Sequence, residues 1–347
     1  MTDYPYPDPN LPAAFKRGVI ERLATANETR RVAAREARRN DDARLTPIKN
    51  VRPLAGNDVP LVYLIRDDLK LVPAFLAHYR RLGVTRFICV DDQSTDGSRE
   101  LLADQPDVDL WTSPLRYKDA RRGRVWREFL FRHYGHDRWY VNVDSDEFLF
   151  YETCETTPLP TLFRSLEAVG QKRLLAPMLD LYPVQPLAAA AYGNQPGQMP
   201  WEIATHFDGS GFRLETIKRG VTMTGGPRVR KFGYRLELVK FPVIFWDSKC
   251  GMGVSVHQPL PFQRNHVPPQ GVLLHFKFFS DYREKIEAAA ESGQYYDSSA
   301  AYQGMRDALT NDSELDFDYE GSVRFDGTSS QLRKLGFFGA LPAPGAS

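Results

Sequence analysis

The segment LVYLIRDDLKLVPAFLAHYRRLGVTRFICVD, residues 61–91, decides the fold class of this chain. It begins with a continuous apolar run at 61–65, which is typical of a β-strand buried on both faces. A helical pattern follows, with Asp68 as its expected N-cap and Gly83 where a glycine ends a helix. A second apolar run, residues 87–90, completes a strand–helix–strand unit. Such a unit predicts neighbouring parallel strands.

The same alternation continues along the chain. Two more strands are expected at 108–112 and 139–143, with apolar residues at helical spacing between them, from Trp126 to His133. We therefore predict an α/β protein of Rossmann-like type, with a mostly parallel central sheet flanked by helices.

The C-terminal half shows a looser order. Residues 183–235 are rich in Gly, Pro and polar groups, so we expect long ordered loops there. The elements expected around this stretch are strands at 173–181, 236–245 and 272–279, and helices at 161–169 and 282–290.

Residues 1–50 stand apart from this pattern. Their start is rich in proline, residues 13–39 have a helical composition, and five arginines lie within 30–39. One interpretation is a solvated helical arm, and another is a docking arm for anionic lipid or for a partner subunit. We expect an N-terminal arm (1–50), one large domain (51–335) and a loose C-terminal tail (336–347).

Composition excludes several classes of protein. The 347 residues include 45 Lys and Arg against 44 Asp and Glu, a net charge of +1, which argues against a general nucleic-acid binder. Three widely spaced cysteines form no disulfide framework and favour a reducing compartment. No secretory signal is recognisable, and no apolar run approaches the roughly 18 residues that span a bilayer. These features predict a cytoplasmic protein, at most peripheral to a membrane.

Three polar clusters follow the predicted strands at their carboxyl ends. They are residues 66–68, residues 91–96 and residues 144–147. In open parallel sheets ligands bind at this edge, so we expect the clusters to meet there. So many carboxylates would repel one another. A divalent cation or a set of hydrogen-bond donors must offset that repulsion.

Asp144 and Asp146 are the strongest candidates for cation binding. They follow the fourth strand directly, and residues i and i+2 of an extended chain point the same way. Carboxylate oxygens suit Mg²⁺ or Mn²⁺, and such a cation can neutralise a bound diphosphate as it leaves. A solvated turn is the alternative interpretation of Asp-x-Asp, but its position after a buried strand favours the metal.

The motifs at residues 90–98 and 143–148 resemble those of the family 2 glycosyltransferases of the GT-A fold. The closer resemblance is to a bacterial branch with the order Arg-Asn-Glu, Tyr-His-x-x-Leu-Gly, Asp-x-x-Ser-Thr-Asp-Gly and Asp-x-Asp-Glu-Phe. Here residues 66–68 read Arg-Asp-Asp, and residues 78–83 begin with His-Tyr. The resemblance covers roughly residues 60–335 and includes later segments at 225–232 and 273–277.

The resemblance implies a hexosyltransferase-type enzyme that transfers a sugar from a nucleotide donor, UDP above all, to a glycan or a lipid-linked acceptor in surface polysaccharide synthesis. It also implies roles for residues. Asp91 would hold the base, with Asp92 as second choice, and Arg66 would contact the nucleotide. Asp144 would serve both nucleotide and metal, and Asp146 would bind the metal.

Two later segments carry further candidates. His275 and Lys277 lie on one face of a strand end, and the resemblance implies a metal ligand and a diphosphate contact, whereas a packed core histidine is the alternative. Residues 225–231 contain Arg228 and Arg230 behind two glycines. They are interpreted either as a solvated turn or as a flexible loop that meets phosphate or an anionic acceptor.

The proton acceptor of an inverting transfer is expected to be a carboxylate or a histidine. Asp180 is the leading candidate, because an acidic residue in an apolar strand is unfavourable unless it is used or paired. Asp208, Asp247, Glu202 and His257 are its competitors.

Two rival functions have different chemistry. A sugar-phosphate nucleotidyltransferase would need a glycine-rich phosphate loop near the first strand, whereas residues 62–71 contain no glycine. A non-catalytic glycan- or partner-binding protein on the same fold would have lost its acidic residues, but Asp91, Asp144, Asp146 and His275 are all present. The expected partners are a nucleotide sugar and its acceptor, with no nucleic acid; a second copy remains an alternative partner for the arm.

Overall fold

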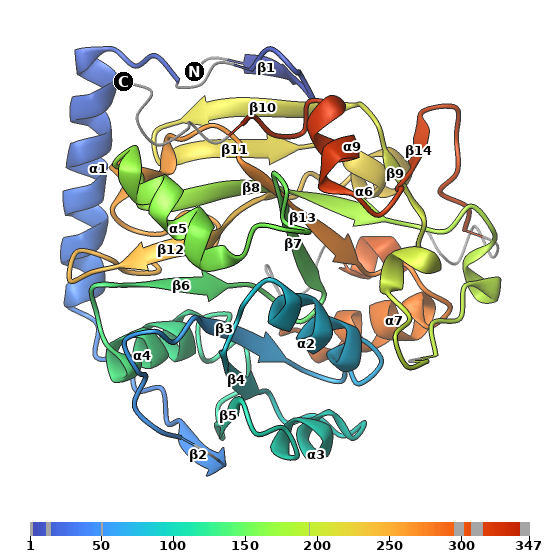
Figure 1. The fold of residues 1–347 in the computed structure, drawn as a ribbon, viewed down its shortest axis with the longest axis horizontal. Helices are drawn as coiled ribbons and strands as arrows, with labels where there is room; N and C mark the ends of the chain where they lie inside the picture. The colour runs from blue at the N-terminus through green and yellow to red at the C-terminus, as the bar shows by residue number, and fades with distance from the viewer. Residues whose placement is uncertain are drawn as a thin grey trace.

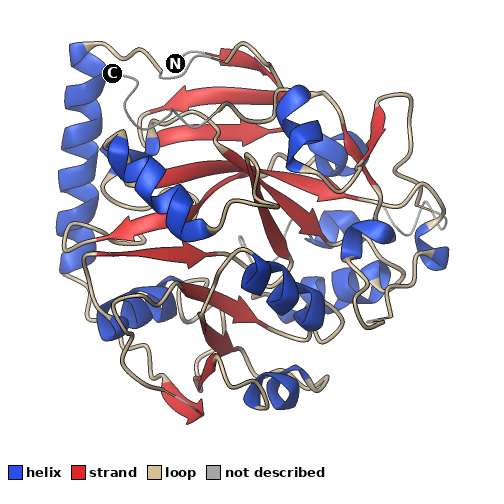
Figure 2. Ribbon diagram, viewed as in Figure 1, coloured by secondary structure: helices blue, strands red, loops and turns tan. Residues whose placement is uncertain are grey.

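The computed structural model of this chain describes residues 3–11, 15–49, 51–193, 195–294, 302–306 and 315–340. Helices cover both faces of a central nine-stranded sheet, and a smaller three-stranded sheet lies beside it (Figures 1 and 2). The predicted α/β class is confirmed.

The central sheet has the strand order β2-β5-β4-β3-β6-β12-β8-β13-β7. Strands β5, β4, β3 and β6 pair in parallel, as do β8 and β13. Strand β12 runs antiparallel between β6 and β8, and the edge strands β2 and β7 are also antiparallel to their neighbours. The strands are β2 (Thr46–Lys49), β3 (Pro60–Ile65), β4 (Arg86–Asp91), β5 (Val108–Thr112), β6 (Arg138–Asn142), β7 (Glu147–Tyr151), β8 (Arg173–Leu181), β12 (Val239–Trp246) and β13 (Gly271–Phe276).

The apolar run of β3 is explained by two separate cores. Leu61, Tyr63 and Ile65 pack with side chains of α2 (Val72–Arg81), α3 (Ser98–Ala103) and α5 (Leu159–Ala168). The alternate residues, Val62 and Leu64, pack with α4 (Arg124–Tyr134) on the other face. Because successive side chains of a strand point to opposite faces, a strand covered on both sides has no polar position.

Long ordered loops were expected at 183–235; the described residues of 183–205 are mostly loop, but the expectation was wrong for 206–232. Residues 206–232 contain β9 (His206–Asp208), β10 (Phe212–Ile217), β11 (Gly220–Thr224) and the helix α6 (Gly226–Phe232). The first four residues of β10, FRLE, alternate apolar and polar side chains, a period-two signal that marks a half-buried strand. The short elements that complete the fold are η1 (Leu187–Ala189), η2 (Pro200–Glu202), η3 (Phe262–Asn265), α7 (Tyr282–Ser292), β14 (Ser322–Arg324) and α9 (Ser329–Lys334).

The first and the last segments of the described residues pack together in the C-terminal half of the fold. Strand β1 (Asp3–Tyr6) pairs antiparallel with β10, and the Tyr6 hydroxyl donates to the carbonyl of Phe337. Phe337 and Phe338 are buried, so the chain is packed at the point where the loose tail was expected to begin. The rest of that predicted tail, 341–347, lies outside the described residues.

The helix of the arm, α1 (Val19–Ala37), begins later than the predicted 13–39, of which residues 13 and 14 lie outside the described part. It packs on η3 through a narrow stripe, Thr25, Glu28 and Val32. Within the described ranges, no helix is long and apolar enough to cross a membrane.

Helix α2 protects the open edge of the central sheet. Strand β7 ends the sheet, so among the strands of the described residues none pairs with the other side of its backbone. The buried Tyr79 hydroxyl donates to the carbonyl of Glu147 (2.9 Å) and accepts from the N–H of Leu149 (3.2 Å). His78 Nε2 donates to the carbonyl of Leu149 (3.0 Å), and burial lowers the pKa of His78 to about 3, which keeps it neutral. The His-Tyr pair therefore has a structural role: it satisfies the edge of β7.

We predict that Tyr79→Phe lowers the free energy of unfolding by about 1–3 kcal/mol, because the change leaves a buried carbonyl and a buried N–H without their partner. Urea unfolding of the two proteins measures the difference. An unchanged midpoint with an unchanged slope would show that the hydroxyl does not stabilise β7.

Candidate functional site

A cavity of about 290 Å³ opens at the carboxyl ends of β3, β6 and β13, beside α7. All three predicted polar clusters contribute to its wall, so the structure brings them together as expected. Its charged lining residues are Arg66, Asp67, Asp68, Asp92, Asp144, Asp146, Lys277 and Lys285. Another cavity, of about 410 Å³, lies between residues 41–43 and α4 and has none of these strand-end carboxylates in its wall.

The turns after β3 and β4 are held to each other. Asp67 adopts a positive φ of 50°, and its Oδ1 accepts from the N–H of Thr95 (2.7 Å). Its own N–H donates to Ser94 Oγ (3.1 Å). Asp68, the expected N-cap of α2, does not cap it, because Leu71 is at the N-cap position. Asp68 instead accepts from Ser145 Oγ (2.6 Å) and pairs with Lys285 (2.6 Å).

Buried cations offset the repulsion at the Asp-x-Asp turn. Lys240 on β12 pairs with both Asp144 and Glu147, and Arg127 on α4 also pairs with Asp144. Burial opposes ionisation of Asp144, but the two cations outweigh it and hold the pKa of that carboxyl well below its usual range. Glu147 Oε2 in turn accepts from the N–H of Asp144 (2.9 Å), which closes the turn.

Lys240, Arg127 and Lys285 are site residues that the sequence analysis missed. The available signal was a lone lysine in the apolar strand VKFPVIFW, together with an arginine on the buried face of α4. A buried charge is unfavourable unless it is paired, so Lys240 and Arg127 each indicated an acidic partner elsewhere in the chain.

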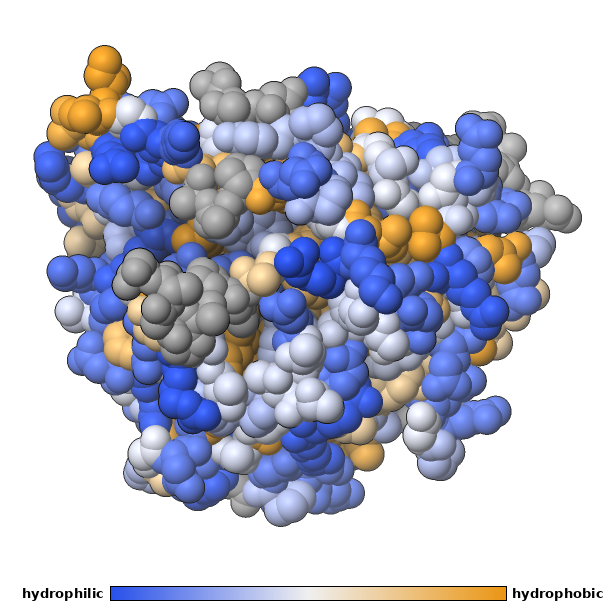
Figure 3. All heavy atoms as spheres, turned by 45° about the horizontal axis from the view of Figure 1, so that its top comes forward, coloured by the Kyte–Doolittle hydropathy of each residue, from blue (hydrophilic) through white to orange (hydrophobic). Residues whose placement is uncertain are grey.

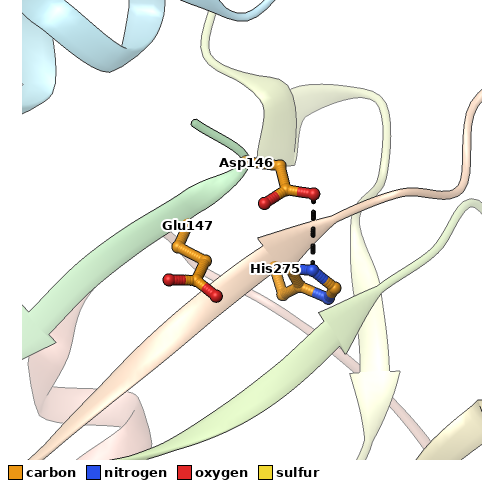
Figure 4. A group of neighbouring side chains, drawn as sticks. All are labelled: Asp146, Glu147 and His275. Carbon is orange, nitrogen blue, oxygen red and sulfur yellow. Dashed lines mark ion pairs between the residues drawn. The ribbon is translucent and has the colours of Figure 1, made fainter. Parts of the chain in front are cut away.

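Strand β13 places His275 between two carboxylates. His275 is opposite Glu147 in its pairing with β7 and opposite Asp180 in its pairing with β8. Its Nε2 lies 3.4 Å from Asp146 Oδ2, as drawn in Figure 4. Burial opposes the imidazolium, but Asp146 and Asp180 outweigh it and raise the pKa of His275. Lys277, two residues on, reaches the same Asp146 oxygen at 2.7 Å.

Asp180 does not face the cavity, although we expected it to act as the catalytic base. It is 2% exposed, and its two oxygens are occupied: Arg228 Nε donates to Oδ2 (2.8 Å), and His275 Nδ1 lies 2.5 Å from Oδ1. Burial alone would raise the pKa of Asp180, but Arg228 and His275 lower it to about 2. Asp180 therefore contacts Arg228 and His275, and it is not among the residues that line the 290 Å³ cavity.

The geometry of Asp146 and His275 fits a divalent cation. Ligand atoms of Asp146, Glu147 and His275 lie within 4.8 Å of one another (Figure 4). Glu147 is already held by Lys240 and the Asp144 N–H, which leaves Asp146 and His275 as the better ligands. When Nδ1–H donates to Asp180, the neutral imidazole presents the lone pair of Nε2 toward Asp146, the arrangement that metal-binding histidines use.

Asp92 lines the cavity and Asp91 does not, which reverses their expected order. Asp91 is fully buried: its Oδ2 accepts from Arg99 Nε (2.7 Å), and its Oδ1 accepts from the N–H of Ser94 (3.1 Å). Asp92 lies 3.8 Å from Arg66 and 3.4 Å from Arg116. Burial, with a smaller effect of nearby carboxylates, raises the pKa of Asp92 to about 7.

The residues expected to form a phosphate loop have other partners. Residues 226–232 form α6, and Arg228 is buried against Asp180. Arg230 pairs with Asp208 (2.8 Å) and lies over the ring of Tyr319. The wall of the 290 Å³ cavity contains neither arginine, nor the four competitors of Asp180, which are Asp208, Asp247, Glu202 and His257.

Comparison with known proteins finds only distant similarities. No protein-family model matches this sequence, and no match was found among curated proteins. Three solved structures that the chain resembles are the WbbM bifunctional glycosyltransferase (16% identity, 38% of this chain and 24% of that chain, TM-score 0.25), the mannosyltransferase PcManGT from Pyrobaculum calidifontis in complex with GDP-Man and Mn²⁺ (13%, 83% and 78%, 0.32), and 4-diphosphocytidyl-2C-methyl-D-erythritol synthase (13%, 42% and 68%, 0.26). The chain spans about a quarter of the first of these. At this distance the function has to be argued from the site.

We predict that Asp92→Asn changes how stability depends on pH. In the unfolded chain an aspartate has a pKa of about 3.9, whereas the folded Asp92 keeps its proton up to about pH 7. Between these values the unfolded state loses its proton first, so the wild type loses stability as the pH rises. Asparagine does not titrate. Relative to the variant, the wild type should therefore lose about 1–3 kcal/mol between about pH 4 and pH 8.

Urea unfolding of both proteins at several pH values measures this difference, and the contributions of groups distant from Asp92 cancel in the comparison. A difference that stays constant across the range would show that Asp92 is ionised throughout.

Proposed function

We propose that this chain is a metal-dependent glycosyltransferase that transfers a hexose from a nucleotide sugar, UDP-linked above all, to a glycan or lipid-linked acceptor. One observation carries the proposal: Asp146 and Lys277, 131 residues apart in the sequence, meet beside Asp144 in the wall of a cavity at the carboxyl ends of the strands, and the buried His275 lies against Asp146. The α/β architecture is consistent with the GT-A fold that the motifs imply. The resemblance to bacterial enzymes extends the proposal to surface polysaccharide synthesis in the cytoplasm.

In the proposed complex, the two ends of the donor meet different groups. Asp92 and Arg66 contact the base and ribose end, where Asp92 accepts from an N–H of the base when ionised and donates to a carbonyl oxygen when protonated. Lys277 and Lys285 contact the diphosphate. Asp146 and His275 hold Mn²⁺ or Mg²⁺, which when bound neutralises charge on the leaving diphosphate.

The buried cations have a separate task in this proposal. Lys240 and Arg127 keep Asp144 ionised and fixed, so it is ready to accept from a donor hydroxyl. Asp180, held by Arg228, fixes the tautomer and the orientation of the His275 ring. Both arrangements preorganise the site. The charged groups are in place before the donor arrives, so little reorganisation is needed when charge develops on the leaving group.

A hydrolysis screen tests the function directly. The full chain is incubated with a panel of nucleotide sugars and Mn²⁺, and released sugar and nucleoside diphosphate are measured. Donor cleavage that stops in excess EDTA supports the proposal. Release of pyrophosphate from a nucleoside triphosphate and a sugar phosphate would instead identify a nucleotidyltransferase. No donor-dependent rise in melting temperature with any nucleotide and metal would favour a non-catalytic binding protein.

We predict that Asp146→Asn lowers turnover of the best donor by about 100-fold or more, because a neutral amide is a poor ligand for a hard cation whose charge stabilises the leaving group. The exposed Asp119 serves as the matched control, and Asp119→Asn should leave turnover unchanged. Full activity of Asp146→Asn at limiting Mn²⁺ would remove Asp146 from the metal site.

We predict that Asp180 acts through His275. The double variant Asp180→Asn/Arg228→Met keeps an oxygen for the Nδ1–H of His275 and removes both buried charges, so it avoids an unpaired arginine. It should raise the Mn²⁺ concentration for half-maximal activity by about 10- to 100-fold. Saturating Mn²⁺ should recover most of kcat. A catalytic base would give the opposite result: a loss of kcat that no Mn²⁺ concentration restores.

A further inference from the structure

Helix α1 has two faces of different character. With 3.6 residues per turn, Val19, Leu23 and Arg30 fall on the side opposite the buried stripe Thr25, Glu28 and Val32. Val19, Ile20 and Leu23 at the start of the helix are 73%, 83% and 57% exposed, and they are the most exposed of the large apolar side chains in the described part of the chain. Hydrophobic atoms project at the upper left corner of the molecule in Figure 3, the corner at which α1 begins in Figure 1.

Two of the three glutamates of α1 lie against the protein body, where Glu28 pairs with Arg219 and Glu36 with Arg121. The same glutamates also pair with Arg31, Arg35 and Arg39 of the arm. The third glutamate, Glu21, accepts from the N–H of Gly18 at the helix start. Arg22, Arg30, Arg31 and Arg35 of α1, and Arg38 and Arg39 directly after it, are exposed to solvent, and Arg30 and Arg38 lie on the half of the helix that faces away from the buried stripe.

We propose that this outer face of α1 docks on an anionic lipid surface. The arginines would lie against the negative headgroups, and Val19, Ile20 and Leu23 would enter the boundary between headgroups and acyl chains. Basic side chains attract a helix to anionic lipid, and apolar side chains that enter the lipid boundary add buried apolar area. The proposal does not depend on the proposed function.

Two features favour lipid over a protein partner. A second copy of this chain would bring the same row of arginines against itself, because a two-fold interface uses one patch twice, and like charges repel. The apolar tip also projects from the surface. A projecting tip inserts readily into lipid, whereas a protein would need a matching hollow to receive it.

Docking on this face would leave the cavity open. Helix α1 runs along the left edge of Figure 1, and the arrowheads of β3, β6 and β8 point away from it, toward the side where the cavity opens. Nucleotide binding should therefore be the same on and off the membrane.

Sedimentation of the full chain with vesicles tests the proposal. The vesicles contain phosphatidylcholine alone or phosphatidylcholine with phosphatidylglycerol. The variants are Ile20→Ser/Leu23→Ser, which removes apolar side chains, and Arg30→Gln/Arg38→Gln, which removes charge. Val184→Ser is the matched control, because Val184 is an exposed valine (45%) outside the arm. Circular dichroism checks that each variant keeps its helix content.

We expect binding to the anionic vesicles only, and weaker binding at high salt. Ile20→Ser/Leu23→Ser should bind about 100-fold more weakly, since burying each apolar side chain corresponds to about a tenfold gain in affinity. Arg30→Gln/Arg38→Gln should lose about tenfold or more. The control should bind like the wild type.

Other results would overturn the proposal. They are an absence of binding to anionic vesicles, equal binding by all variants, and a wild-type dimer in analytical ultracentrifugation that Ile20→Ser/Leu23→Ser converts to monomer. The last result would show that a second copy covers this face.

Discussion

The pairing of strand-end carboxylates with buried cations at one edge of the sheet is the constraint on which the rest of this structure depends. Asp144 and Glu147 share the ammonium group of Lys240, and Arg127 adds a second cation. These charges come from β12 and α4, on different sides of the Asp-x-Asp turn. Because an unpaired buried charge is strongly unfavourable, the turn can form only when the sheet and α4 have assembled around it. The site and the fold are therefore stabilised together.

Strand register determines which side chains meet at this edge. Strand β13 lies between β8 and β7, and its pairing with both sets His275 opposite Asp180 on one side and Glu147 on the other. A shift of one residue would turn His275 to the opposite face of the sheet. The edge of β7 is in turn held by His78 and Tyr79 from α2. A sequence motif far from the cavity thus positions the strand that carries Glu147.

The N-terminal segment contributes a strand to the small sheet and also a helix with an exposed outer face. Strand β1 is an integral part of the small sheet, and Glu28 anchors α1 through Arg219. The remainder of α1 contributes few side chains to the core, so its stability comes from this narrow stripe and from its own backbone hydrogen bonds. Such a helix can change its outer face without disturbing the fold, which leaves that face available for binding.

The sequence by itself determined the local elements and the kind of chemistry. Largely apolar runs predicted β5 and β8 with the same bounds as the structure, because strands buried on both faces are mostly apolar and the few charged residues in them must be paired. Alternation of strands and helices predicted the parallel part of the sheet, and carboxylates after strands predicted an acidic edge.

Only the tertiary structure decided which charged residues pair with one another and which line the cavity. Asp91 and Asp92 look alike in sequence, yet Arg99 holds Asp91 inside the protein and leaves Asp92 to the cavity. Asp180, the expected base, has its two oxygens in contact with Arg228 and His275. Lys240 and Arg127 became part of the site through strand and helix packing. Each of these outcomes depends on a partner that is distant along the chain, and local patterns carry no information about such pairs.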